Sequence, residues 1–206
     1  MRRTEFAVAR PELEAAVLRE VMDTAGVGYL GLLDEAGYPR VVPLNFVYQN
    51  ECVYFHGALD GEKFEIMSRS PRATFSADIP YALIPSYWVA KDFACPATTL
   101  FKATLVRGWI RVVEDVGEKA SMLQGLMEKY QPEGGYRPIT LEEPLYRTAL
   151  TKVAVFRLEP EHVSVKSKFQ QHKAEKVRRE IANRLLERDQ GRDRQAAEEI
   201  LRTLEE

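Results

Sequence analysis

The sequence lacks the features that identify a disulfide-stabilised, membrane-spanning or highly charged protein. Only two cysteines occur among 206 residues, Cys52 and Cys95, so no disulfide framework is indicated and their pairing stays open. No apolar run approaches the ~18 residues that a membrane helix needs. The formal net charge is only -2, so no overall field attracts nucleic acid. We therefore expect neither a membrane nor a nucleic acid as a partner.

Short motifs of several enzyme and metal-binding classes are also missing. The three histidines, His56, His162 and His172, show no metal-ligand spacing with the cysteines, and we expect no metal site. There is no G-x-S-x-G, P-loop or G-x-G-x-x-G motif. Residues 1–14 contain arginines but no apolar signal core, so we expect a cytoplasmic protein.

The pattern of the chain up to residue 168 predicts many strands and few helices. Strands are expected at residues 27–33, 40–48, 52–56, 73–77, 100–113 and 150–158, with one more around Val163 and Val165. Helices are expected at residues 11–25, from residue 62 and at 116–130. Residues 78–98 and 131–148 are predicted to be long irregular connections. This order favours a mainly β (α+β) barrel over a doubly wound parallel sheet.

Residues 39–69 are the stretch around which the other elements are arranged. Two predicted strands are joined by a turn at residues 49–51, and a loop with two glycines, Gly57 and Gly61, then leads into a helix. A glycine loop before a helix N-terminus presents free N–H groups and the positive end of the helix dipole, which suits a phosphate. Lys63 lies in the first helical turn, where a cation is unfavourable for the helix itself. It is therefore a candidate anion ligand; the alternative is a solvated surface lysine.

The C-terminal residues have a different composition, and we predict a helical extension over residues 169–206. An apolar stripe in residues 173–188 contains Ala174, Val177, Ile181, Ala182 and Leu185, and Asp193 can cap a second helix. The stripe must be buried on the barrel or on a partner chain, and the sequence leaves both open. Between Lys166 and Arg194 there are ten basic and five acidic residues. The simplest interpretation is a solvated helix face, and a nucleic-acid or membrane patch is the alternative.

The sequence resembles the flavin-binding split-barrel superfamily that includes pyridoxamine 5'-phosphate oxidase, and most of all its nitroimidazole-resistance (Nim-type) branch. The resemblance is carried by Pro39, Pro43, Phe46 and Tyr48, then by Tyr54-Phe55-His56-Gly57-Ala58 and Gly61-Glu62-Lys63, and it continues to about residue 158. It implies a split β-barrel over residues 1–168 with short flanking helices. It also implies a homodimer that binds flavin mononucleotide (FMN) at or near the interface.

The resemblance also implies which residues bind the cofactor. A strand on the outside of the barrel would supply backbone amides and apolar walls from Val41, Val42, Pro43, Leu44 and Asn45. Gly57, Ala58 and Lys63 would hold the phosphate, and His56 would contact the cofactor or a small acid near it. Pro43 has no N–H, so we expect it at a sheet edge or a bulge. The alternatives are that Val42, Leu44 and Phe46 are core residues and that His56 makes only a local hydrogen bond.

The chain departs from the Nim-type pattern in one strand. Residues Phe101-Lys102-Ala103 stand where many Nim-type sequences carry Tyr-Arg-Ser, so two hydroxyls are lost while Lys102 keeps a charge and is counted among the cofactor-binding residues. The run from Lys166 to Lys173 is similar to the tail of PaiB-like flavin-binding regulators.

Two functions follow from the resemblance. The first is an FMN-dependent reductase or oxidase of a small molecule such as a nitroaromatic. The flavin would supply the redox chemistry, so no catalytic side chain is assigned. The second is a non-catalytic flavin or small-ligand binding protein, including a PaiB-like regulator that uses the basic tail. Haem or a deazaflavin in the same barrel is a third option, and the substrate stays open.

Overall fold

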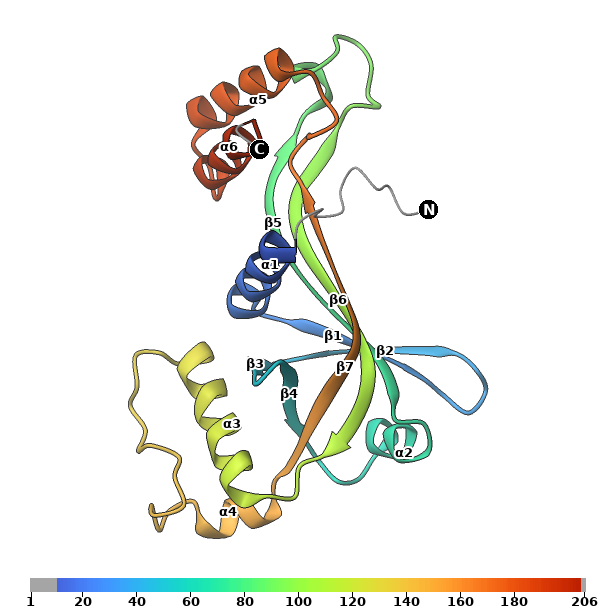
Figure 1. The fold of residues 1–206 in the computed structure, drawn as a ribbon, viewed down its shortest axis with the longest axis vertical. Helices are drawn as coiled ribbons and strands as arrows, with labels where there is room; N and C mark the ends of the chain where they lie inside the picture. Colours follow the sequence, from blue (N-terminus) through green and yellow to red (C-terminus); the bar gives the residue numbers. More distant parts are fainter. Residues whose placement is uncertain (1–10, 205–206) are drawn as a thin grey trace. The chain divides into compact units, whose positions relative to one another are not determined.

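The computed structural model describes residues 11–204 of the chain. This part contains seven strands, six α-helices and one short 3-10 helix (Figure 1). The helices are α1 (Pro11–Thr24), α2 (Glu62–Arg69), α3 (Val116–Tyr130), α4 (Arg147–Lys152), α5 (Glu175–Arg188) and α6 (Asp193–Arg202), and the 3-10 helix is η2 (Ser86–Trp88). The strands are β1 (Gly28–Leu33), β2 (Pro39–Leu44), β3 (Val47–Gln49), β4 (Cys52–Gly57), β5 (Arg72–Ile84), β6 (Thr98–Val112) and β7 (Ala154–Lys168).

All seven strands belong to one sheet, in the order β2-β1-β5-β6-β7-β4-β3. The pairs β1–β2, β1–β5, β3–β4 and β4–β7 are antiparallel. β2 and β3 are neighbours in the sequence but lie at opposite ends of the sheet order, as in a sheet that curls into a split barrel. The predicted mainly β (α+β) split-barrel fold is thus confirmed. β2 is an edge strand, which is the position expected for Pro43.

The chain divides into two compact units. Unit 1 contains residues 11–21, 78–103 and 165–204 of the described chain, and unit 2 contains residues 22–77 and 104–164. β5, β6 and β7 each contribute residues to both units. The predicted division into residues 1–168 and 169–206 stays a prediction.

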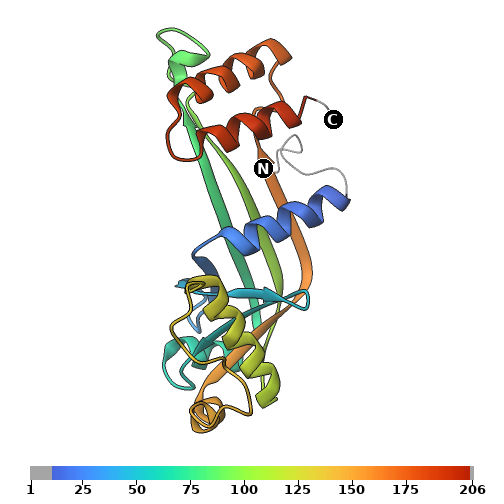
Figure 2. The ribbon, with the colours of Figure 1, turned by 90° about the vertical axis from the view of Figure 1, so that its left-hand side faces the viewer.

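In unit 2 the helix α3 packs against β3 and β4 (Figure 2). The side chains between them form an apolar cluster of Val47, Tyr54, Val113, Met122, Leu126 and Val155. The helix begins after Asp115, whose carboxylate accepts a hydrogen bond of 2.7 Å from the Glu118 backbone N–H and so caps the helix. Burial of the apolar face fixes the position of α3, and with it the position of its last residues, Lys129 and Tyr130.

In unit 1 the helices α5 and α6 lie side by side (Figure 2). Ile181, Leu185 and Ile200 are fully buried. Arg188 pairs with Asp193 at 2.7 Å, and its guanidinium also lies 4.8 Å from the centre of the Trp88 ring. Ile181, Ala182 and Leu185 of the predicted stripe are therefore buried within the chain, whereas Val177 is half-buried and Ala174 is exposed.

Three secondary-structure predictions need correction. Residues 78–84 continue β5 instead of starting an irregular connection, because buried Ile79 and Tyr81 keep the strand alternation while Pro80 falls on an exposed position. The predicted strand at 150–158 begins only at Ala154, since residues 147–152 form α4, and it continues without a break through residues 163–168. The predicted strand 40–48 is divided into β2 and β3.

None of the helices in the described part of the chain is both long enough and apolar enough to cross a membrane.

Two adjacent leucines of α5 test whether the tail is part of the core. Leu185 is fully buried, whereas Leu186 is 39% exposed. Leu185→Ala should lower the free energy of unfolding by about 3 kcal/mol, because it removes buried methyl groups and leaves a cavity. Leu186→Ala, the matched control, should cost less than about 1 kcal/mol. Urea denaturation of both variants measures the difference, and equal losses would contradict the burial of this face.

Candidate anion site at the start of helix α2

The edge strand β2 presents two different faces. Cross-strand pairing places Val41 opposite Gly31 and Pro43 opposite Tyr29. Val41 is 62% exposed on that face. Val42 and Leu44 point to the other face and are half-buried. Neither residue is a fully buried core side chain, so both keep surface that a ligand can contact.

Phe46 explains why the predicted strand 40–48 is broken. Its ring is fully buried and packs edge-on against Phe75 at a centroid distance of 4.8 Å. Its backbone N–H donates to the Tyr130 hydroxyl at 3.1 Å, a contact outside the strand ladder. The Lys129 ammonium lies 3.5 Å from the centre of the Phe46 ring and donates to the Met22 carbonyl at 2.7 Å. Burial lowers the pKa of Lys129 to about 8.

The end of β4 and the start of α2 bring three predicted site residues together. His56 and Gly57 are the last residues of β4 and pair with β7. Gly61, with φ of 86°, precedes the first turn of α2. The Lys63 ammonium nitrogen lies only 2.8 Å from the point that a Cβ at position 57 would occupy. Glycine at this position therefore lets the lysine fold back over the end of β4.

The charge of Lys63 is not compensated within the described chain. Among residues 11–204 no carboxylate lies within ion-pair distance of its ammonium group, which is half-buried. Burial lowers the pKa of Lys63. The pKa of His56 is lowered by burial and by the nearby Lys63 charge. An anion bound here would offset the Lys63 charge. It would therefore raise the pKa of His56 and stabilise the ammonium group.

Two ion pairs hold α2 beside the β1–β2 hairpin. Arg40 of β2 pairs with Glu62 at 2.5 Å, and Arg69 pairs with Glu35. Arg40 thus places a second cation at the start of α2, paired with Glu62, the residue before Lys63. The sequence analysis did not name Arg40 as a site residue. The available signal was the two-residue spacing of Arg40, Val42 and Leu44, which places all three on the same face of β2.

Lys102 is placed differently from the other predicted cofactor-binding residues. It belongs to unit 1, its side chain is only 2% exposed, and it pairs with Glu20 at 2.7 Å and Glu199 at 2.8 Å. Tyr81 also donates to Glu20, and burial together with this hydrogen bond raises the pKa of Tyr81. Because two carboxylates already compensate Lys102, this geometry speaks against its role as a cofactor ligand.

The predicted site is therefore assembled in part. His56, Gly57 and Lys63 meet at the start of α2, and the Arg40–Glu62 ion pair connects them to β2. Ala58 follows β4 and Asn45 follows β2, both at exposed positions. The protein is a split barrel in which the edge strand β2 is connected to the start of α2, where the Lys63 ammonium group is free to bind an anion.

Comparison with known proteins identifies the family. Residues 14–167 match the model of the pyridoxamine 5'-phosphate oxidase family. The chain belongs to the pyridoxamine 5'-phosphate oxidase family, as the sequence motifs predicted. No curated protein sequence matches the chain.

Several solved structures share the fold. A protein from Bacteroides thetaiotaomicron VPI-5482, described as a 5-nitroimidazole antibiotic resistance protein, has 21% identity and a TM-score of 0.59, over 78% of this chain and 85% of its own. The flavocytochrome Anf3 from Azotobacter vinelandii has 18% identity and a TM-score of 0.63, over 82% and 72%. The FAD and haem binding protein from Mycobacterium smegmatis has 15% identity and a TM-score of 0.62, over 78% and 72%.

The coupling between Lys63 and His56 can be measured directly. Lys63→Gln removes the like charge that opposes the imidazolium, so the pKa of His56 should rise toward its ordinary value. NMR titration of the histidine ring protons checks this shift. Lys152→Gln is the control, since Lys152 is an exposed lysine of α4. An unchanged His56 pKa in the Lys63→Gln variant would contradict the proximity of the two groups.

Proposed function

We propose that the protein is a flavoprotein that binds FMN and acts as a reductase or oxidase of a small molecule. The observation that carries this proposal is the uncompensated Lys63 ammonium beside Gly57 at the start of α2. Family membership supports it, and so do two structural relatives, a flavocytochrome and an FAD and haem binding protein.

The residues at the start of α2 fit a terminal phosphate. The first backbone N–H groups of a helix have no partner inside the helix and carry its positive dipole end. Lys63 would add a charge-assisted hydrogen bond to a phosphate oxygen. Arg40 would strengthen the positive potential, although Glu62 offsets part of its charge. A phosphate at this position favours FMN over a ligand without one.

The edge strand β2 fits the rest of the cofactor. One side of an edge strand leaves N–H and C=O groups without strand partners, and a flat ring can take the place of the missing strand. Val42 and Leu44 offer half-buried apolar surface next to these groups. Pro43 interrupts the row of donors and so limits pairing with a true strand.

His56 would act next to this site as a hydrogen-bonding group. In the ligand-free protein its lowered pKa favours the uncharged ring at pH 7, whereas a phosphate bound at Lys63 would raise that pKa and favour the imidazolium. The bound flavin would supply the electron-transfer chemistry. His56 would orient a small substrate and hold or release a proton at its ring nitrogen.

We infer that the protein forms a homodimer through the outer face of β1 and β2. Tyr29, Leu33 and Val41 are 45%, 54% and 62% exposed, and pairing places them on one face with Pro39 and Pro43. A contiguous exposed apolar face of this kind is typical of a protein interface. The edge strand of the cofactor site borders this face, so a partner would cover the flavin.

Lys63 should contribute to FMN binding through the phosphate alone. Lys63→Ala should weaken FMN affinity about tenfold or more, because it removes a hydrogen bond between charged groups. Riboflavin, which has no phosphate, should bind the variant and the wild type equally. Fluorescence titration measures both ligands, and Lys152→Ala is the control.

An equal loss of FMN and riboflavin affinity would contradict the phosphate assignment, and an unchanged FMN affinity would contradict the site. Retention of FMN without turnover of a nitroaromatic by a reduced nicotinamide donor would favour the non-catalytic alternative.

A single charged substitution on β1 tests the proposed dimer interface. Tyr29→Asp places a carboxylate in an apolar interface, where it would lose its hydration, so the dimer should dissociate to monomer at micromolar concentration. Analytical ultracentrifugation measures the change. Tyr87→Asp is the matched control, because Tyr87 is a 68% exposed tyrosine of unit 1. A variant that stays dimeric would place the interface elsewhere.

A further inference from the structure

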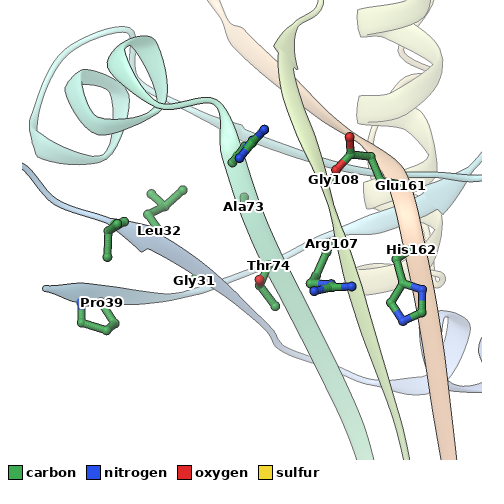
Figure 3. Close-up of a pocket in the computed structure, with 11 residues that line it drawn as sticks. Gly31, Leu32, Pro39, Ala73, Thr74, Arg107, Gly108, Glu161 and His162 are labelled. Carbon is green, nitrogen blue, oxygen red and sulfur yellow. The ribbon is translucent and has the colours of Figure 1, made fainter. Parts of the chain in front are cut away.

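Unit 2 contains a hollow that is lined by none of the residues predicted to bind the cofactor. Its volume is about 710 Å³ (Figure 3). Its polar lining comes from Thr74, Arg107 and His162, which lie on three successive strands of the sheet, together with Arg72. Leu33 and Pro39 provide exposed apolar walls from β1 and β2, and buried Leu32 also borders the hollow. A volume of this size accommodates a small organic molecule.

The cations of this hollow are not compensated by carboxylates. Within residues 11–204 neither Arg72 nor Arg107 forms an ion pair. Arg72 lies 4.9 Å from the centre of the Trp109 ring, so its guanidinium is held in place by stacking. Arg107 is exposed and has no polar partner in the described chain. The guanidinium groups of the two arginines can each form two hydrogen bonds with the oxygen atoms of a carboxylate or phosphate bound in the hollow.

His162 adds a buried group without a partner. Its ring nitrogen Nε2 has almost no contact with solvent and makes no hydrogen bond within the described residues. Such an atom is costly to bury, because it loses its hydrogen bond to water without a replacement. Figure 3 shows the His162 ring on the same side of the strands as the Arg107 guanidinium. His162 lines the hollow, so a turn of its ring would bring this nitrogen into contact with a ligand there.

One carboxylate, that of Glu161, also lines the hollow and reduces its positive potential. Glu161 accepts a hydrogen bond from the Trp109 indole N–H, and Figure 3 shows its carboxylate pointing away from the Arg107 guanidinium. Gly31 keeps the centre of the hollow open between Leu33 and Thr74. A Cβ at position 31 would lie 3.3 Å from the Thr74 carbonyl oxygen, so a side chain there would crowd the neighbouring strand.

We propose that this hollow is a second binding site, which takes a small molecule with a carboxylate or phosphate on an apolar body. Arg107 and Arg72 bind the anionic group, the His162 ring turns to form one hydrogen bond, and Leu33 and Pro39 contact the apolar part. The proposed site does not depend on FMN, because none of the residues assigned to FMN lines the hollow. The rim residues Leu33 and Pro39 belong to the apolar face assigned to the dimer, so a partner would narrow the opening.

Benzoate and phenyl phosphate are the probes, because both join a ring to an anionic group and together they distinguish the two anion types. Titration of the full-length protein with either probe should shift the NMR signals of the His162 ring. Arg107→Gln should weaken the binding that these shifts report by about tenfold or more. Arg111→Gln is the matched control, since Arg111 lies on the same strand, pairs with Glu159 and does not line the hollow.

The outcomes separate this site from the proposed phosphate site. Lys63→Ala should leave the His162 shifts unchanged while it weakens FMN binding. Arg107→Lys keeps the positive charge but loses the bidentate guanidinium, so it should bind the probes with intermediate affinity. This result would show that the weaker binding of Arg107→Gln is not caused by a folding defect. Wild-type protein whose His162 signals do not respond to either probe would overturn the proposal. So would equal affinities of the Arg107→Gln and Arg111→Gln variants.

Discussion

The departure of the chain from β2 at Phe46 is the constraint on which the barrel depends. Only two residues, exposed Asn45 and buried Phe46, separate two strands that lie at opposite ends of the sheet order. The Phe46 ring is held by Phe75 and Lys129, and its N–H bonds to Tyr130 instead of to a strand. Because β3 does not run beside β2, the outer side of β2 stays without a strand partner. The curl of the sheet and the edge available to a ligand therefore have one cause.

Two lysines show how burial and pairing decide between a structural and a binding role. Lys102 is almost completely buried, but two carboxylates compensate its charge, so it holds α1 and α6 to β6 within unit 1. Lys63 is only half-buried, yet no carboxylate of the described chain compensates it. A partly desolvated charge without a partner costs folding free energy. Such a cost is typical of functional sites, where a ligand supplies the missing charge.

Much of the fold and part of the site follow from local sequence patterns. The glycine loop before α2 and the motif around His56 predicted where Lys63, His56 and Gly57 meet. The break at Phe46 was not predictable, because residues 40–48 alternate like a continuous strand and the break depends on contacts with Phe75 and Tyr130. The pairing of Lys102 depends on residues 82 and 97 positions away, which no local pattern contains. Short α4 and the continuation of β5 past Pro80 were missed because proline and polar residues dominated the local pattern.

The helical tail keeps the basic excess that suggested a regulator, although several of its arginines are paired. Residues 166–194 have an excess of basic side chains, which is the feature that suggested a regulator. In the structure Arg179 and Arg184 pair with glutamates one turn away on α5, and Arg188 and Arg194 pair with aspartates. Arg178 is buried against α6. Each of these ion pairs uses one basic and one acidic residue, so pairing leaves the excess of basic over acidic residues in this segment unchanged. Lys63, Arg72 and Arg107, the cations argued above to bind small ligands, all lie in unit 2, so small-ligand binding there does not require the basic tail.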